Sequence, residues 1–129
     1  ILMEDLFFTA TATTPYVDFK KTGVLELSGK VISSEDSEFW TIIFKWVEEY
    51  AKNPSPSTMV KIQLDYFNSS SLLEINKFVK LLGGINSTDF EVNIIWHYNK
   101  VDLYMYEIGC ELSNRNNIFF EMELIPEFV

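Results

Sequence analysis

The sequence predicts an α/β fold, a single domain in which helices pack on a mixed β-sheet in the order β-β-α-β-α-β-α-β. Three observations support this prediction. Apolar and polar residues alternate in several short runs, which is the pattern of half-buried strands. Between these runs apolar residues recur every three or four positions, as in amphipathic helices. Strands that alternate with such helices are joined by right-handed crossovers, so most of the sheet should be parallel.

Two runs near the beginning of the chain predict a β-hairpin. Tyr16–Phe19 and Val24–Gly29 are apolar or alternating, and the polar, glycine-containing segment Lys20–Gly23 separates them. Two short strand-like runs around such a turn are typical of antiparallel pairing. We therefore expect the sheet to begin with an antiparallel hairpin.

The first helix is predicted after the polar segment Ser33–Ser37. Its apolar positions are Phe39, Ile43, Trp46 or Val47, and Tyr50, with Trp40 and Phe44 widening the apolar face. Asp36 or Ser37 is the expected N-cap, because a short polar side chain can bond to the first free amides. The helix should end before Asn53-Pro54-Ser55-Pro56-Ser57, since proline cannot continue it.

A strand, a turn and a second helix are predicted next. The segment Thr58–Phe67 is strand-like, and its inward positions are Val60, Ile62, Leu64 and Tyr66. Asn68-Ser69-Ser70-Ser71 ends the strand, and helical spacing then links Leu72, Ile75, Val79 and Leu82. Glu74 stands three residues after Ser71, as in a capping box, and Gly83-Gly84 is expected to end the helix.

The last third of the chain predicts a strand, a third helix and a closing strand. Phe90–Tyr98 and Ile118–Leu124 have strand patterns. The helix between them is marked by Val101, Met105, Ile108 and Leu112. No repeat or linker interrupts the pattern, so we expect residues 1–129 to form one domain with its core at about 6–124.

Composition excludes several classes of protein. The chain has 129 residues, a formal net charge of -9 and 47% hydrophobic residues, so whole-chain disorder is excluded. Nucleic acid and anionic membrane are poor partners, because affinity for either depends on Lys and Arg. No apolar stretch approaches the ~20 residues that span a bilayer, and the first eight residues lack the basic start of an export signal. A single cysteine fits a reducing cytoplasm, where we expect the protein to be.

A search for catalytic chemistry is mostly negative. There is no glycine-rich phosphate loop that opens a helix. His97 and Cys110 are the chain's only histidine and cysteine, and we expect both to be structural, with Cys110 a small core residue, because one imidazole and one thiol are too few for a usual zinc site. The acids Glu48, Glu49, Glu107 and Glu111 are most simply solvated helix faces. We therefore expect no metal, no cofactor and no enzyme activity.

The polar run Asn68-Ser69-Ser70-Ser71 is the candidate site, and two interpretations of it stay open. In the first, Ser71 caps the helix and the other side chains satisfy free backbone N–H groups. In the second, the run is a phosphorylation switch at the carboxyl end of a strand, where partners of open α/β sheets often bind. A phosphate there adds about -1.5 to -2 charges.

Several segments together carry a resemblance to a known family. They are Thr14-Pro15-x-Val17-Asp18-Phe19, Gly23-Val24-Leu25-x-Leu27-Ser28-Gly29, Trp46-Val47-Glu48-x-Tyr50, Leu64-Asp65-Tyr66-Phe67-Asn68-Ser69-Ser70-Ser71, Trp96-x-Tyr98 and Asp102-x-x-Met105-x-Glu107-x-Gly109. With these segments the chain resembles the SiaC-like biofilm-regulation phosphoproteins. These are small bacterial proteins with a fold like the sulfate-transporter and anti-sigma-factor-antagonist (STAS) domain of the SpoIIAA anti-anti-sigma factors.

The resemblance implies a non-enzymatic signalling adaptor. In such proteins a kinase phosphorylates the hydroxyl after the Asn, a PP2C-type phosphatase removes the phosphate, and the unmodified form binds a diguanylate cyclase. The matching hydroxyl is Ser69, and Asn68, Ser70 and Ser71 would complete the partner-binding surface. The family usually has Thr at the position of Ser69 and Lys at that of Leu73.

Two function classes remain from the sequence. The first is a phosphorylation-controlled interaction module in cyclic-di-GMP signalling. The second is an anti-anti-sigma-like or plain protein-binding domain without phosphoregulation, in which the serines only cap a helix. A small enzyme with a crevice near His97 is a distant third.

Overall fold

The computed structural model describes residues 3–34 and 38–126, in which six strands form one sheet and three α-helices pack on it. The strands are β1 (Leu6–Phe8), β2 (Tyr16–Phe19), β3 (Val24–Val31), β4 (Ser57–Phe67), β5 (Glu91–Tyr98) and β6 (Phe120–Leu124). The helices are α1 (Phe39–Lys52), α2 (Leu72–Ile85) and α3 (Leu103–Arg115), and a short 3-10 turn, η1 (Ser69–Ser71), leads into α2.

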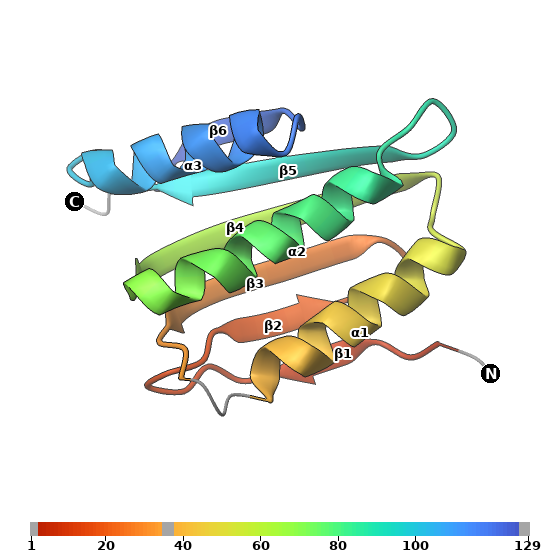
Figure 1. Cartoon of the computed structure of the whole chain (residues 1–129), viewed down its shortest axis with the longest axis horizontal. Helices are drawn as coiled ribbons and strands as arrows, with labels where there is room; N and C mark the ends of the chain where they lie inside the picture. Colours follow the sequence, from red (N-terminus) through yellow and green to blue (C-terminus); the bar gives the residue numbers. More distant parts are fainter. Residues whose placement is uncertain (1–2, 35–37, 127–129) are drawn as a thin grey trace.

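The strands follow one another across the sheet in sequence order. β1, β2 and β3 are antiparallel neighbours, whereas β3, β4, β5 and β6 are parallel. Because the order never reverses and such crossovers are right-handed, all three helices lie on the same face of the sheet (Figure 1). The predicted α/β class and mixed sheet are confirmed. The predicted element order is confirmed from β2 onward, and the short strand β1 was not predicted.

The core lies between this helical layer and the sheet. Phe19 of β2 stacks on Phe78 of α2 and contacts Trp46 of α1, with ring centroids 5.8 and 5.3 Å apart. Farther along the sheet, Trp96 of β5 is buried, and its indole N–H donates to the carbonyl of Met105 at 3.0 Å. These contacts attach α1 and α2 to β2, and α3 to β5.

No helix of the described residues covers the opposite face of the sheet. Parallel sheets are normally covered on both faces, but here the outward residues of the central strands include Glu26, Lys61, Gln63 and His97, which are polar. The Lys61 ammonium lies 3.9 Å from the Glu26 carboxylate. The face is therefore compatible with water.

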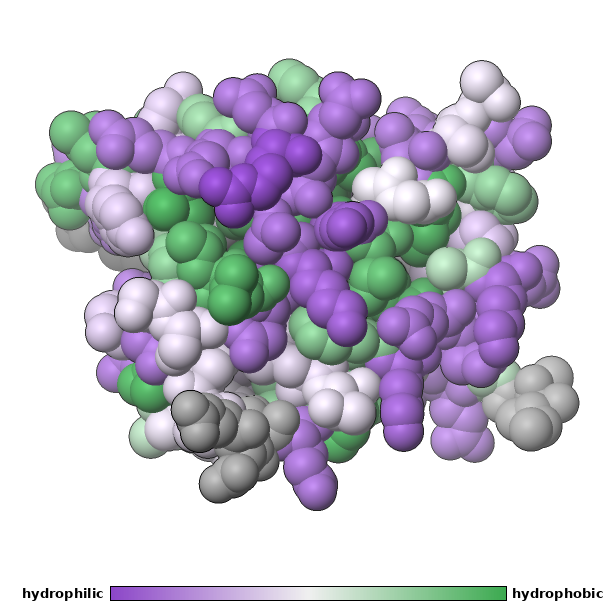
Figure 2. Space-filling model, in the orientation of Figure 1, coloured by the Kyte–Doolittle hydropathy of each residue, from purple (hydrophilic) through white to green (hydrophobic). Residues whose placement is uncertain are grey.

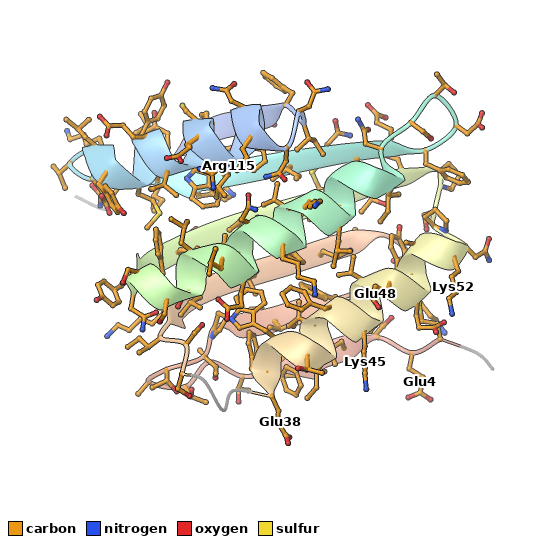
Figure 3. All side chains as sticks on the ribbon, viewed as in Figure 1. Glu4, Glu38, Lys45, Glu48, Lys52 and Arg115 are labelled. Carbon is orange, nitrogen blue, oxygen red and sulfur yellow. The ribbon has the colours of Figure 1, made fainter. Side chains whose placement is uncertain are left out.

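Charged side chains cover the outside of the helices. Lys45, Glu48 and Lys52 point away from the sheet on α1 (Figure 3). Glu49, Glu107 and Glu111 are exposed as well, which confirms the interpretation of these acids as solvated helix faces. Within residues 3–34 and 38–126, no helix has the length and apolar character needed to cross a membrane.

Three sequence predictions about helix bounds and buried faces are wrong. α2 does not end at Gly83-Gly84 but continues to Ile85, because Ile85 is buried and anchors the last turn, while no other residue crowds Gly84. Val101 is 80% exposed and precedes α3 rather than contributing to its buried face.

Tyr66 is the third wrong prediction. It is exposed, whereas Phe67 is buried. The register between β3 and β4 shifts at this point, since Gly29 pairs with Leu64 but Lys30 pairs with Tyr66. The extra residue, Asp65, reverses the alternation of faces. The predicted N-cap of the first helix, Asp36 or Ser37, lies outside the described residues.

Candidate functional site

The polar run lies on an exposed rim at the carboxyl end of β4 (Figure 1). Asn68 is extended, with φ -84° and ψ 164°, and η1 then turns the chain into α2. A crevice forms in open α/β sheets where the strand order reverses, and this sheet has no reversal. The site is therefore a surface at the carboxyl ends of the central strands rather than a cleft.

Three side chains of the run bond to the end of β3 and the loop after it. Asn68 accepts from the Ser33 amide through Oδ1 and donates to the Ser33 carbonyl through Nδ2, both at 3.2 Å. The Ser71 hydroxyl donates to the Val31 carbonyl at 3.0 Å and accepts from the Ser33 amide at 3.1 Å. Ser70 donates to the Ser33 carbonyl at 3.3 Å. We call these bonds the Ser33 clamp.

The clamp also includes a bond to the first helix and a bond within the polar run. The Ser33 hydroxyl accepts from the indole N–H of Trp40 at 3.1 Å, and Ser71 also bonds to the Asn68 side chain. Two neighbouring crossover segments, the one before α1 and the one before α2, are therefore joined by side chains. Sequence reasoning missed Ser33, because nothing in its own neighbourhood indicates a partner 35 to 38 residues away.

The predicted capping box at Ser71 is wrong. The Ser71 side chain makes no capping bond to α2 and is fully buried. Its backbone is already helical, with φ -75° and ψ -19°, because η1 starts the helical path two residues earlier. Its hydroxyl consequently points back to β3 instead of forward to the amide of Glu74.

Ser69 differs from its neighbours. It is exposed, and within the described part of the chain its hydroxyl makes no hydrogen bond. It stands at the start of the helical path formed by η1 and α2, where the helix dipole and free N–H groups favour negative charge. Among the three serines of the run, Ser69 is therefore the one whose hydroxyl is both exposed and free of bonds to the described residues.

The other candidates of the sequence lie elsewhere. His97 is half-buried on the open face of the sheet, beside Lys61 and Gln63 in a hollow of about 130 Å³. Cys110 is half-buried on α3, so its interpretation as a core residue is wrong. A hydrogen bond with Cys110, together with the negative charge of its thiolate, raises the pKa of Tyr106. The structure brings neither residue to the serine run, and no group of three acids, histidines or cysteines in residues 3–34 and 38–126 is arranged to hold a metal ion.

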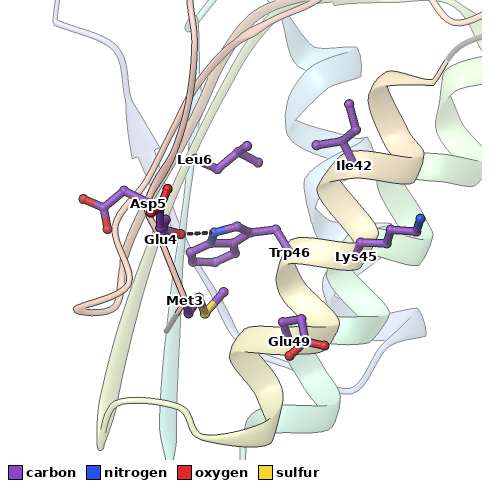
Figure 4. Close-up of a pocket in the computed structure, with 8 residues that line it drawn as sticks. All are labelled: Met3, Glu4, Asp5, Leu6, Ile42, Lys45, Trp46 and Glu49. Atoms are coloured by element: carbon purple, nitrogen blue, oxygen red, sulfur yellow. Dashed lines mark hydrogen bonds between the residues drawn. The ribbon is translucent and has the colours of Figure 1, made fainter. Parts of the chain in front are cut away.

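An open apolar groove of about 420 Å³ lies between α1 and the segment that leads into β1 (Figure 4). Met3, Leu6, Ile42 and Trp46 line it, and the indole N–H of Trp46 donates to the Glu4 carbonyl at 2.8 Å. The indole N–H of Trp46 is therefore already hydrogen-bonded within the protein. We assign no chemistry to this groove.

Comparison with known proteins adds a family to this geometry. Residues 8–126 match the model of a family described as SiaC family regulatory phosphoprotein. An uncharacterized protein of Pseudomonas aeruginosa strain UCBPP-PA14 is 24% identical over 126 residues, covering 97% of this chain and all of that protein.

Solved structures of SiaC from Pseudomonas aeruginosa have the same fold. The structure of apo-SiaC superposes with a TM-score of 0.83 at 22% identity and covers 94% of this chain and 99% of its own. SiaC has also been solved in complex with the diguanylate cyclase SiaD, of which it is the activator, and a chain of that structure superposes with a TM-score of 0.83 at 22% identity. That match covers 94% of this chain and all of the other.

Proposed function

This chain belongs to the SiaC family of regulatory phosphoproteins, and from that premise we propose that it is a non-enzymatic adaptor switched by phosphorylation of Ser69. The unmodified protein binds an output protein at the rim that carries Asn68–Ser71. A protein kinase transfers phosphate to Ser69, which releases the output protein, and a PP2C-type phosphatase restores the first state.

The observation that carries this proposal is the difference in bonding between Ser69 and the other residues of the run. Asn68, Ser70 and Ser71 are held by the Ser33 clamp, while the hydroxyl of Ser69 is exposed and bonds to no described residue. Phosphorylation requires an oxygen that can enter a kinase active site. Ser69 offers this oxygen without breaking a bond of the fold.

Phosphorylation and dephosphorylation of Ser69 need only ATP and water as co-reactants. The Ser69 oxygen attacks the terminal phosphorus of ATP, the bond from this phosphorus to ADP breaks, and the hydroxyl proton passes to a base of the kinase. In the reverse half of the cycle, water attacks the phosphoserine phosphorus, the bond from this phosphorus to the Ser69 oxygen breaks, the oxygen takes up a proton, and inorganic phosphate is released. Neither step needs a catalytic group from this chain.

The expected direction of the switch follows from desolvation. A phosphate carries about -1.5 to -2 charges, and covering an ion without a bonded counter-ion costs several kcal/mol. An exposed ion pair returns only about 0 to 1 kcal/mol. Phosphate on Ser69 therefore disfavours any partner that must cover this rim, unless the partner supplies a well-placed cation.

We propose a diguanylate cyclase as the output protein. SiaC of Pseudomonas aeruginosa is an activator found in complex with such a cyclase, and the likeness of the two folds supports the same partner class here. Binding is measured between this protein and the diguanylate cyclase of the cell that makes it. Ser69→Asp should weaken the complex only partly, because a carboxylate carries one charge and fewer oxygens than phosphate, and Ser69→Ala should leave it intact.

Asn114→Asp is the control, since it adds the same charge at an exposed position near the end of α3, away from the rim, and should leave binding unchanged. If Ser69→Asp and stoichiometric phosphorylation both leave binding unchanged, the protein is a plain binding domain. If the cyclase binds only the phosphorylated form, the direction of the switch is opposite to the proposed one.

A further inference from the structure

Exposed hydrophobic side chains gather at one end of the molecule. Among the described residues twelve large hydrophobic side chains are exposed, and half of them lie where α2 and α3 begin and β6 ends. We call these six the carboxyl-edge patch: Leu73, Val101, Leu103, Tyr104, Tyr106 and Leu124. Figure 2 shows hydrophobic surface at the left-hand edge of the molecule, where α3 begins. Single exposed apolar residues are ordinary, but a gathered set indicates an interaction surface.

Ring contacts connect this patch to the serine run. Tyr104 stacks on Phe67 with ring centroids 6.2 Å apart, and Phe67 directly precedes Asn68. Leu73, which is 77% exposed, follows Ser69 by four residues and so lies one helical turn away. A phosphate on Ser69 would therefore stand at the border of the patch.

The patch is hollowed as well as apolar. Tyr98 packs edge-on against Tyr106 with centroids 5.0 Å apart. Beside this pair is a hollow of about 340 Å³, lined by Tyr98, Lys100, Leu103, Tyr106 and Leu124. A concave apolar surface of this kind can receive a side chain from a partner.

Carboxylates border the patch and limit what can cover it. Asp102, which also accepts a bond from the Met105 amide, directly precedes Leu103, and Glu107 follows Leu103 by one helical turn. Lys100 is the one cation among the residues that line the hollow. The whole chain carries a net charge of -9. An anionic lipid surface would be repelled, and a second copy would bring like charges together across the contact.

We propose that the carboxyl-edge patch binds an apolar segment of the output protein that is flanked by Lys or Arg. The apolar side chains of this segment cover Leu103 and Tyr104, and its cations face the carboxylates of Asp102 and Glu107. Phosphate on Ser69 weakens the contact because the cations of the segment face the carboxylates of α3, whereas the phosphate stands before α2 and is covered without a cation of its own. This inference rests on the proposed function, and it adds the surface and the chemistry of the partner.

Photo-crosslinking tests the proposal directly. Tyr104 is replaced by p-benzoylphenylalanine, which keeps an aromatic ring at an exposed position, and the protein is irradiated in the cells that naturally make it. The matched control carries the same group at Phe119, which is 82% exposed and lies just before β6, at the amino ends of the parallel strands and so at the end of the sheet opposite the patch. The crosslinked peptide is then sequenced by mass spectrometry.

We expect at least a tenfold higher yield of a heterologous protein adduct at position 104 than at position 119. The crosslinked peptide should be apolar with flanking Lys or Arg, and prior phosphorylation of Ser69 should lower the yield. A homodimeric adduct, a lipid adduct, equal yields at the two positions, an acidic peptide, or a higher yield after phosphorylation would each overturn the proposal. Phosphate incorporation at Ser69 is measured on the same samples, so failure of the patch is distinguished from failure of the switch.

Discussion

Ser71→Ala should destabilise the protein much more than Ser69→Ala, although the two serines are two residues apart. The Ser71 hydroxyl is fully buried and bonds to Val31 and Ser33 at 3.0 and 3.1 Å. Ser69 is exposed and has no such bond within the described residues. The substitution removes the same atom in both variants, so the difference measures the Ser33 clamp.

The structure sets the size of the effect. When the Ser71 hydroxyl is removed, the Ser33 amide keeps its bond to Asn68, and the Val31 carbonyl still accepts from the Asn68 amide. No backbone group is left without a partner, so the full cost of a buried unpaired group does not arise. The Ser71 hydroxyl has one proton, so it donates one bond at a time, to Val31 or to Asn68, and accepts one from Ser33. The loss of these two bonds should lower the free energy of unfolding by about 1 to 2 kcal/mol, whereas an exposed change such as Ser69→Ala stays within about 0.5 kcal/mol.

Thermal unfolding followed by circular dichroism measures this difference. For a chain of this length 1 kcal/mol corresponds to about 4 °C in Tm, so Ser71→Ala should lower Tm by about 4 to 8 °C. Ser69→Ala should change Tm by less than about 2 °C. Equal Tm values for the two variants would refute the clamp, and a larger loss for Ser69→Ala would show that the roles are reversed.

Two further predictions concern α3. Gly109→Ala places a Cβ 2.6 Å from the Trp96 ring, so overpacking should cost about 1 to 3 kcal/mol in a denaturant titration, and wild-type stability in this variant would contradict the packing described. Cys110→Ala should bring the raised pKa of Tyr106 down toward its ordinary value, because the hydrogen bond with the thiol is the main cause of the rise. The ring-proton NMR signal of Tyr106 against pH measures this. A phenol with a raised pKa in the folded state stabilises the protein below the unfolded pKa, and this stabilisation is lost as pH rises through the folded pKa. For Tyr106 the contribution is therefore present near neutral pH and lost only in alkali. It should be smaller in Cys110→Ala.

Periodicity predicted most of the fold because each helix buries one continuous apolar face. Both alternatives at Trp46 and Val47 are correct, since both side chains are buried in α1. β1 could not be predicted, because a strand of three residues has too few alternations to be recognised. It is a strand only through its pairing with β2.

The errors arise where contacts distant in sequence decide local structure. The bulge at Asp65 depends on the register between β3 and β4. The continuation of α2 through Gly83 and Gly84 depends on the burial of Ile85. Ser71 has the sequence position of a cap, but its hydroxyl bonds to a strand end 40 residues earlier.

The candidate site was predictable in its location but not in its internal bonding. Three successive hydroxyls are more than one helix cap requires, and this marked the run as a candidate site. The structure adds a physical distinction among Ser69, Ser70 and Ser71, because only the first has a hydroxyl without a bond in the described part of the chain.

The most direct test of the switch is the position of the phosphate itself. The protein is incubated with ATP and the kinase of the cell that makes it, and intact and peptide mass spectrometry then count and locate the phosphate. We predict one phosphate, on Ser69, no incorporation in Ser69→Ala, and unchanged incorporation in Ser70→Ala. Phosphate on Ser70 or Ser71 with Ser69 bare, or full incorporation in Ser69→Ala, would contradict the assignment of Ser69 as the acceptor.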